Sequence, residues 1–371
     1  MRSRTRLTAA VAAVAAAATL TTMSLTAASA HGTGDEHRHS AALDHIFVIM
    51  LENHSQSSVI DDPNAPYLTS LAHTYGMADN YYGVTHPSMP NYLATIAGDN
   101  FGVQDDNDQN VVNLDRVNLV DQLEAHRIGW DAYMENLPSD KLARFGPDSS
   151  NPLYAKKHNP FVLFDDVKND PARLAHVRDY SQLGADLNGA HAPQFVWITP
   201  NQCHDMHGGV YGNVGDGAPC PYGSTKDDAN DAALKQKADD FVKGAVTTIK
   251  SSKAWTRHSA IVIVTDENDY TGNAATDGWE SADGCCDSPY VGANDPRVPG
   301  WAGGTYGGGL IPAIVVTATG PRGYVDHTPY NHYSLLTTIE DNWRLGHLGH
   351  AGDAAGGVVP MWPLLANRHR H

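Results

Sequence analysis

The sequence has few basic residues, few cysteines and few aromatic residues. Its 371 residues include 25 Lys and Arg against 42 Asp and Glu, which gives a formal net charge of −17. Binding to a phosphate backbone depends on clustered Lys and Arg, so this balance argues against a nucleic-acid-binding protein and against a basic amphipathic membrane helix. Apolar residues make up 41% of the chain, which is typical of a globular protein with a sizeable core.

Long apolar runs are lacking, apart from one at the N-terminus. Three arginines precede an apolar stretch from about Leu7 to Ala27, which ends in Ala28-Ser29-Ala30. This order predicts a secretory signal peptide over residues 1–30, cleaved after about Ala30, and a signal anchor is the competing interpretation. No second run is long enough to span a bilayer, so we expect a secreted protein without stable membrane insertion.

Only four cysteines are present, at positions 203, 220, 285 and 286. Export permits disulfides, and four cysteines allow three pairings. A Cys203–Cys220 bond would close a Gly/Pro-rich loop, leaving Cys285 and Cys286 to pair with each other or to stay reduced. Neither a C-x-x-C motif nor a zinc-finger spacing occurs, so structural disulfides are favoured over a cysteine metal site.

Four short apolar runs rich in β-branched residues predict strands. They lack polar alternation, which is typical of parallel strands buried on both faces and covered by helices. The runs cover residues 45–51, 195–199, 260–265 and 311–317. Apolar spacing predicts helices over residues 119–126, 228–251 and 333–345, so the fold class is α/β.

No internal repeat or long low-complexity linker divides the interior of the chain. We therefore expect one catalytic domain over residues 42–366. The polar, His/Gly-rich stretch at residues 31–41 and the tail at residues 367–371 are predicted to be disordered.

Polar side chains follow three of the predicted strands. Glu52 and Asn53 follow the first, residues 200–207 follow the second, and Asp266 and Glu267 follow the third. In an open α/β sheet the ligand crevice lies beyond the carboxyl ends of the strands, so we expect the three clusters to converge. Their oxygen atoms suit a divalent cation, without which adjacent carboxylates would repel each other. For each cluster alone, a solvated loop or a helix cap is the competing interpretation.

A serine at the start of a predicted helix is the candidate nucleophile. Ser88 lies at the expected N-cap, Pro90 in the first turn and Gly98 at the end of this helix. Free N–H groups at a helix start favour an alkoxide and a bound phosphoryl oxygen, and a nearby cation would lower the pKa of the hydroxyl. The alternative is a serine that only caps a helix. The chain has no G-x-S-x-G elbow and no local sign of a Ser-His-Asp triad.

Four histidines, His158, His204, His207 and His332, lie beside polar or turn-forming residues. Protonated imidazoles could neutralise phosphate oxygens and donate a proton to a leaving alkoxide, whereas neutral imidazoles could bind a metal. His204 and His207 flank Asp205 and make the strongest individual case, because a lone histidine in a loop is usually an ordinary surface residue.

Taken in order, these motifs resemble the phosphoesterase family of secreted acid phosphatases and non-specific phospholipases C. The resemblance runs from about Asp44 to Gly346. The motifs are Glu52-Asn53-x-Ser55, Ser88-x-Pro90-Asn91, Pro200-Asn201 with His204-Asp205-x-His207, Asp266-Glu267, and His332-x-Ser334 followed by Ile339-Glu340.

The resemblance implies an alkaline-phosphatase-like three-layer α/β/α sandwich with a mostly parallel central sheet. It implies hydrolysis of phosphate esters through a metal-bound serine, Ser88, and a phosphoseryl intermediate, with Glu340 in a supporting position. The implied metal ligands are Glu52, Asn53, Ser88, Asp266 and Glu267. The implied contacts to the phosphoryl group are His204, His207, His332 and His158. The ligand types leave Ca, Mg, Mn, Fe and Zn open as the divalent metal ion.

The details of the motifs favour the acid-phosphatase branch. Phospholipase members usually have an arginine where this chain has His54, and another where Tyr92 stands. We therefore expect a small phosphate monoester as the substrate of a monomeric enzyme. The alternatives are a phospholipase C acting at a phospholipid head group and a non-catalytic exported protein that binds phosphate or metal. The lipase alternative predicts an exposed apolar rim, with Trp255, Trp279, Tyr290, Trp301 and Tyr306 as candidates.

The 20 histidines suggest a prediction for the pH optimum of activity. Without residues 1–30 the chain keeps all of them and has 22 basic against 42 acidic residues, a formal charge of −20. Because the ordinary pKa of histidine is about 6.5, such a chain would approach neutrality towards pH 5. We predict an acidic optimum of activity, set locally by His204, His207 and His332, with a protonated His204 or His332 assisting the leaving group.

Overall fold

The computed structural model describes residues 43–111, 113–145, 152–212, 219–223, 228–268, 282–293, 295 and 301–365. The predicted signal peptide, the two predicted disordered ends and Trp279 lie outside the described residues. Within the described residues, no helix combines the length and apolar character needed to cross a membrane.

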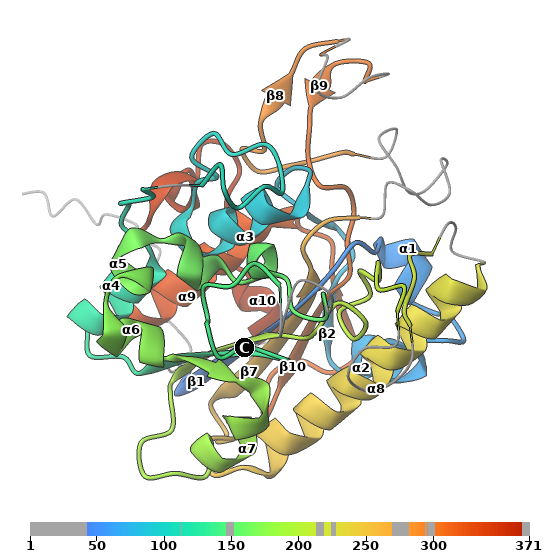
Figure 1. Cartoon of the computed structure of the whole chain (residues 1–371). Coiled ribbons are helices and arrows are strands. Elements are labelled where there is room, and N and C mark those ends of the chain that lie inside the picture. Colours follow the sequence, from blue (N-terminus) through green and yellow to red (C-terminus); the bar gives the residue numbers. More distant parts are fainter. Residues whose placement is uncertain are drawn as a thin grey trace, which may run out of the picture. The chain divides into compact units, whose positions relative to one another are not determined.

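In the described part of the chain, eight strands form the main sheet, in the order β11-β2-β10-β7-β1-β6-β4-β5 (Figure 1). Every neighbouring pair is parallel except the two that involve β10. The strands are β1 (His45–Leu51), β2 (Gly76–Ala78), β4 (Trp130–Met134), β5 (Val177–Asp179), β6 (Phe195–Thr199), β7 (Ser259–Thr265), β10 (Ala313–Thr317) and β11 (Tyr324–Asp326). The predicted α/β class with a mostly parallel sheet is confirmed.

The fourth predicted run forms β10 but runs against the other strands of the sheet. Ala313 lies opposite Val264 and Thr317 opposite Ala260 in its antiparallel pairing with β7. The apolar run had indicated a parallel strand, but burial on both faces does not by itself encode strand direction. The three strands followed by polar clusters, β7, β1 and β6, are parallel neighbours, so their carboxyl ends meet at one edge.

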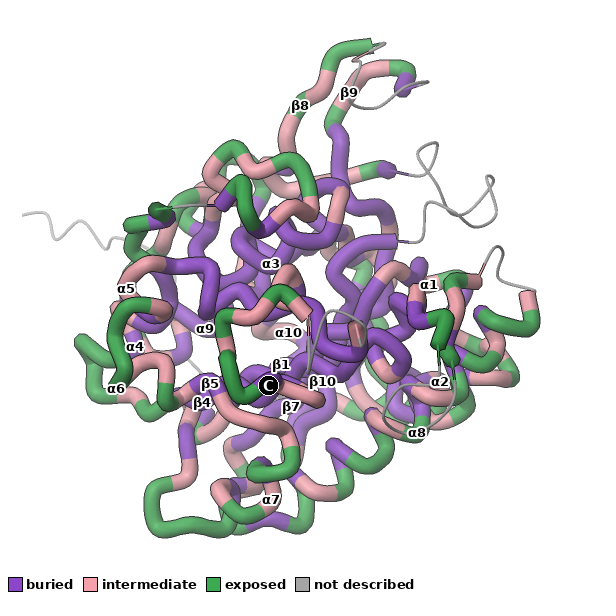
Figure 2. Tube along the Cα trace, viewed as in Figure 1, coloured by how far each residue is buried: buried purple, intermediate pink, exposed green. Residues whose placement is uncertain are grey.

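Helices cover both faces of the sheet and give three layers (Figures 1 and 2). Because side chains alternate along a strand, β1 contributes to two separate cores. Ile46, Val48 and Met50 face the core beneath α3 (Ser88–Ala97) and α9 (His332–Trp343). Phe47, Ile49 and Leu51 face the core beneath α2 (Pro66–Thr74) and α8 (Ala229–Ser251). The structure therefore has the predicted α/β/α layering.

The three predicted helices begin and end within two residues of their expected bounds. They are α4 (Leu119–Ala125), α8 and α9, and each has an N-cap side chain that accepts a backbone N–H. The remaining elements are α1 (Gln56–Val59), α5 (Asp165–Lys168), α6 (Pro171–Ala175), α7 (Leu183–Asp186), α10 (Trp362–Leu365), the 3₁₀ turns Lys156–His158, Pro160–Leu163, Tyr180–Gln182 and Gly349–Gly352, and the short strands β3 (Tyr81–Tyr82), β8 (Tyr290–Val291), β9 (Gly304–Thr305) and β12 (Tyr330–Asn331).

All four cysteines form disulfides, which decides between the pairings left open by the sequence. Cys203 is bonded to Cys220, and the adjacent Cys285 and Cys286 are bonded to each other. The first bond closes the loop after β6. The carbonyls of the second pair accept hydrogen bonds from Asn331 Nδ2, at 3.1 and 3.0 Å, directly before α9.

Glu340 lies inside α9, and its pKa predicts that the stability of the protein depends on pH. Its Oε1 accepts a hydrogen bond from Leu348 N at 2.8 Å, and burial raises its pKa to about 8. In the unfolded chain the pKa is about 4.3, so between these values the folded state binds more protons and stability falls as pH rises. Through this group, the free energy of unfolding of the parent protein should fall by an amount on the order of 2 kcal/mol between pH 5 and pH 7. Glu340→Gln should abolish this fall, as measured by urea unfolding at both pH values.

A control for this prediction is Asp115→Asn, an exposed acid outside α9. The control should keep the pH slope of the parent protein. An unchanged slope in Glu340→Gln would show that Glu340 is ionised in the folded state at neutral pH.

Candidate active site

The three polar clusters meet at the carboxyl ends of β1, β6 and β7. Glu52 N donates a hydrogen bond to Asp205 O at 2.7 Å, and Asp266 N donates to Leu51 O at 3.0 Å. Asn53 has a left-handed φ of 47°, which asparagine tolerates better than most residues, and its N–H donates to Asp266 Oδ1 at 3.1 Å. Main-chain hydrogen bonds therefore hold the three segments against one another.

Ser88 lies between two carboxylates and an ammonium group. Its hydroxyl is within hydrogen-bond reach of Glu52 Oε2 at 3.1 Å and Glu267 Oε1 at 3.3 Å, and it accepts from Lys157 Nζ at 3.4 Å. The predicted N-cap position is wrong, because Pro87 holds the cap and Ser88 is the first helical residue. Its backbone N–H is still one of the free donors of the first turn.

The loop before α3 is held by side chains from the same motif. Asn91 Oδ1 accepts hydrogen bonds from Val84 N at 2.9 Å and Thr85 N at 3.0 Å, and its Nδ2 donates to Thr85 O at 2.7 Å. His86, which the sequence did not single out, has Nδ1 2.6 Å from Glu267 Oε2. These contacts position both Ser88 and the carboxylate beside it.

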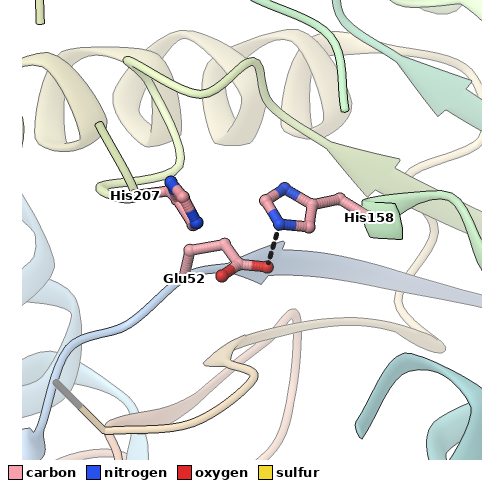
Figure 3. Close-up of side chains that lie close together, drawn as sticks. All are labelled: Glu52, His158 and His207. Atoms are coloured by element: carbon pink, nitrogen blue, oxygen red, sulfur yellow. Dashed lines mark ion pairs between the residues drawn. The ribbon is translucent and has the colours of Figure 1, made fainter. Parts of the chain in front are cut away.

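His158 and His207 lie with Glu52 in a cluster that could hold a metal ion (Figure 3). One ligand atom from each of the three residues lies within 4.8 Å of the other two, and all three residues are buried. His158 Nε2 is 3.0 Å from Glu52 Oε1. The carboxylate of Glu52 thus faces Ser88 with one oxygen and the imidazoles with the other.

The partners of both imidazoles leave Nε2 facing this cluster. His158 Nδ1 is 3.3 Å from Asp205 Oδ2, and His207 Nδ1 is 3.0 Å from Gly208 O. An acceptor at Nδ1 favours a proton there and a lone pair at Nε2, and the ammonium of Lys157, 3.3 Å from His207 Nε2, favours the same tautomer of His207. An imidazole that donates its other N–H to a carboxylate or carbonyl is the usual arrangement of a metal-binding histidine.

The carboxylates of the site are buried close to one another. Burial raises the pKa of Glu52, Asp205 and Asp266, and the neighbouring negative charges raise these pKa values further. Asn53 Oδ1 and Asp266 Oδ2 are buried without a hydrogen-bond partner among the described residues. Both oxygens belong to the predicted ligand set, and a cation would satisfy both and offset the repulsion. The residues present therefore fit a divalent metal ion.

Lys157 is the main feature of the site that the sequence did not single out. Its Nζ lies 2.7 Å from Asp106 Oδ2 and 3.3 Å from His207 Nε2. Burial opposes its charge, but Asp106 and Glu52 outweigh burial and raise its pKa above the usual range. Lys157 is therefore a cation beside Ser88. Its position directly before His158 was the only available signal.

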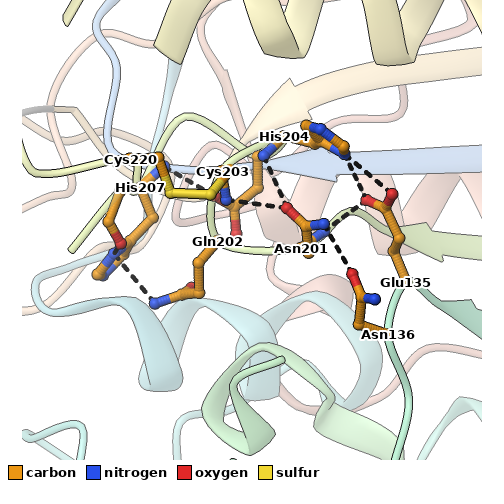
Figure 4. The surroundings of a disulfide bond; sticks show 10 residues. Glu135, Asn136, Asn201, Gln202, Cys203, His204, His207 and Cys220 are labelled. Atoms are coloured by element: carbon orange, nitrogen blue, oxygen red, sulfur yellow. Dashed lines mark hydrogen bonds and ion pairs between the residues drawn. A yellow bond between two sulfur atoms is a disulfide. The ribbon is translucent and has the colours of Figure 1, made fainter. Parts of the chain in front are cut away.

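His204 and His332 do not join the cluster with a free imidazole. Figure 4 shows His204 turned away from His207, with Nδ1 2.9 Å from Glu135 Oε1. His332 Nε2 lies 2.6 Å from Asp266 O and its Nδ1 lies 3.2 Å from Tyr81 OH. His332 therefore holds the main chain of the segment that carries the candidate ligand Asp266.

Burial disfavours the charged form of three of the candidate histidines. Burial lowers the pKa of His158, and it lowers the pKa of His207 to about 3 and of His332 to about 4. Burial therefore argues against positive charge on His207 and His332 near pH 5, and Lys157 is the cation beside Ser88. Composition could not show this, because the pKa of a histidine depends on its burial.

The family model for the Phosphoesterase family matches residues 58–346. The chain belongs to the Phosphoesterase family. The matched range contains Ser88, Lys157, the four candidate histidines, Asp266 and Glu267. Glu52 and Asn53 precede this range, and the structure brings them to the same edge of the sheet.

Relatives of this Phosphoesterase family member include named phosphatases. A probable acid phosphatase of Kluyveromyces lactis is 29% identical over 321 residues, covering 85% of this chain and 62% of that protein. A phosphatidylinositol-3-phosphatase of Mycobacterium tuberculosis is 33% identical over 165 residues, covering 44% of this chain and 52% of that protein. The chain thus spans about three fifths of the length of the first relative and half of the second.

A solved structure from work on glycosaminoglycan metabolism by Bacteroides thetaiotaomicron matches with a TM-score of 0.51. It is 12% identical and covers 88% of this chain and 82% of that chain. At this level of identity the likeness concerns the fold of this Phosphoesterase family member and not its substrate.

Proposed function

We propose that this protein is a secreted, metal-dependent phosphomonoesterase of the acid-phosphatase type. The proposal rests on the position of the Ser88 hydroxyl, 3.1 Å from Glu52 Oε2 and 3.4 Å from Lys157 Nζ. A serine at a helix start, between groups that can take its proton and a cation that favours its alkoxide, is arranged as a nucleophile. The phosphatase names of two relatives support the same reaction class.

In the proposed reaction, Ser88 Oγ attacks the phosphorus atom in line with the leaving alcohol. The bond from Ser88 Oγ to phosphorus forms as the bond from phosphorus to the alcohol oxygen breaks, and the departing alkoxide takes up a proton from solvent. The hydroxyl proton passes to Glu52 or Glu267, which both lie within hydrogen-bond reach. Lys157 donates hydrogen bonds to the phosphoryl group, and water then hydrolyses the phosphoseryl intermediate.

Glu52, Asn53, Asp266 and Glu267 would hold the divalent cation together with Ser88, and His158 and His207 lie on the other side of Glu52. When bound, such a cation would supply positive charge to the phosphoryl oxygens and lower the pKa of the Ser88 hydroxyl. The mixed oxygen and imidazole donors are compatible with Ca, Mg, Mn, Fe and Zn.

The phospholipase C alternative receives little support from the aromatic residues that it invoked. Of the four described candidates, Trp301 and Tyr306 are buried and Trp255 lies against Phe47 in the core. Tyr290 alone among those four is largely exposed, at 79%. These four residues do not form the apolar rim that a lipid-binding crevice would need.

The proposed function is tested by assaying the metal-reconstituted protein between pH 4 and pH 9. The substrates are p-nitrophenyl phosphate, bis(p-nitrophenyl) phosphate and phosphatidylcholine. We expect the monoester to be hydrolysed fastest, with a loss of about 100-fold or more on chelation. We expect an optimum below pH 7 from the likeness to a probable acid phosphatase and not from the buried histidines, whose charged form burial disfavours. Faster cleavage of phosphatidylcholine would favour the lipase, and stoichiometric binding without turnover would favour the binding protein. A profile rising steadily to pH 9 would contradict the acid-phosphatase type.

A further inference from the structure

We propose that the pocket beside Ser88 binds a second oxyanion, a carboxylate or a phosphate, carried by the alcohol part of the substrate. This inference rests on the proposed function and adds a substrate class to it. The alcohol would then be selected by Arg144 and Lys156, two residues outside the catalytic cluster.

The pocket has a volume of about 350 Å³ and shares residues with the catalytic cluster. Lys157 and His207 line it, and Lys157 Nζ also contacts Ser88 Oγ at 3.4 Å. A phosphoryl group held at Ser88 and Lys157 therefore has this pocket beside it. Ser88 itself is only 1% exposed, and the pocket offers space beside it for the alcohol part of the substrate.

Among the described residues that line the pocket, positive charges outnumber negative charges by one. Arg144 Nε lies 3.0 Å from Asp108 Oδ1 and Lys156 Nζ lies 3.3 Å from Asp108 Oδ2, so two cations share one buried carboxylate. Lys157 and Asp106, at 2.7 Å, form a separate pair with no net charge. The described lining of the pocket is thus net positive, although the whole chain has a formal charge of −17. Guanidinium and ammonium groups are the usual partners of oxyanions.

Tyr222 and His207 give part of the pocket wall an aromatic character. The ring of Tyr222 lies 5.0 Å from the ring of His207, and a Cβ at Gly209 would lie only 2.9 Å from Tyr222 Cζ. The Cys203–Cys220 disulfide ties this wall to the loop after β6 (Figure 4). A small ring can thus lie against Tyr222 while its substituent reaches Arg144 and Lys156.

The test compares two esters of the same size, 3-carboxyphenyl phosphate and 3-carbamoylphenyl phosphate. The neutral carbamoyl group withdraws electrons at least as strongly as a carboxylate, so leaving-group chemistry alone does not favour the carboxylate ester. We expect kcat/KM to be about 3- to 10-fold higher for the carboxylate ester at low salt, with the preference falling as salt is raised. A third substrate, 1,3-phenylene bisphosphate, shows whether phosphate is preferred to carboxylate.

Two variants should move this preference in opposite directions. Arg144→Gln removes the surplus charge, so the ratio of kcat/KM values should fall towards one, whereas Asp108→Asn leaves both cations unpaired and should raise it. Lys156→Gln removes the other cation beside Asp108 and should lower the ratio of the two kcat/KM values in the same way. Arg116→Gln, an equal charge change on the exposed surface, should keep the parent ratio.

The outcomes separate this inference from the proposed function. Equal kcat/KM for the two esters, or a preference that Arg144→Gln and Lys156→Gln leave intact, would overturn the inference while the phosphomonoesterase remains. Failure to hydrolyse any of the three esters would overturn the proposed function and the inference with it.

Discussion

Replacement of Ser88 by alanine is expected to lower kcat on a phosphate monoester by about 10⁴-fold or more. Ser88 is the one hydroxyl in the described site that lies within reach of Glu52, Glu267 and Lys157 together. Removing a nucleophile abolishes the covalent route, and comparable losses follow when a catalytic serine is removed from other enzymes. The loss should appear in kcat at saturating substrate, measured with p-nitrophenyl phosphate.

A matched control for this substitution is Ser58→Ala. Ser58 is also buried, but its hydroxyl donates to Ser55 O at 2.9 Å and has no contact with the cluster. The control should keep kcat within a few-fold of the parent protein. Near-parental turnover in Ser88→Ala would show that another group, or a water molecule, attacks the phosphorus atom.

Glu52→Gln is expected to weaken metal binding and activity together while it stabilises the metal-free protein. Glu52 is the residue shared by the oxygen donors around Ser88 and by the two imidazoles. Burial and the charge of Asp266 raise its pKa, so its ionised form is disfavoured in the metal-free fold. The variant should lose about 10³-fold in kcat/KM. In chelator, its free energy of unfolding at pH 7 should rise, because glutamine places no negative charge in this buried site.

The control for Glu52→Gln is Glu135→Gln, the same change at the end of β4. Glu135 pairs with His204 at 2.9 Å and accepts a hydrogen bond from Asn201 N, outside the metal-ligand cluster. It should retain bound metal, determined by elemental analysis after dialysis. If Glu52→Gln bound metal as tightly as the parent protein, Glu52 would not be a ligand.

Much of the fold was predictable because burial on both faces leaves a clear pattern in the sequence. The strands β1 and β6 have the predicted bounds, since each is an uninterrupted apolar run between polar residues. The direction of β10 was not predictable, because it depends on pairing with β7 and not on its own residues. The short strands β2 and β11, of three residues each, carry too little pattern to stand out.

The site was predictable where residues directly follow a strand. Glu52, Asp266 and Glu267 converge because parallel neighbouring strands end at one edge. Lys157 and His86 were missed, since each lies in a loop whose path depends on tertiary packing. The direction of the His204 ring could not be predicted either, because its partner Glu135 lies 69 residues away in the sequence.

The buried histidines show why residue counts are a poor guide to the source of positive charge in a site. An exposed histidine is partly charged near pH 6, but His207 and His332 are enclosed by protein, and burial lowers their pKa values. Lys157 keeps its charge in the same surroundings because Asp106 compensates for its burial. The electrostatics of the site thus depend on contacts between segments distant in the sequence.

The most direct test of the account is to trap the covalent intermediate. The metal-reconstituted protein is mixed with a phosphate monoester at acidic pH, quenched with acid within milliseconds and digested for mass spectrometry. The account predicts a phosphoryl group on Ser88, at up to one per chain, which disappears as substrate is exhausted and is absent from Ser88→Ala. Steady turnover with no phosphoserine at any time, or a phosphoryl group on another residue, would contradict it.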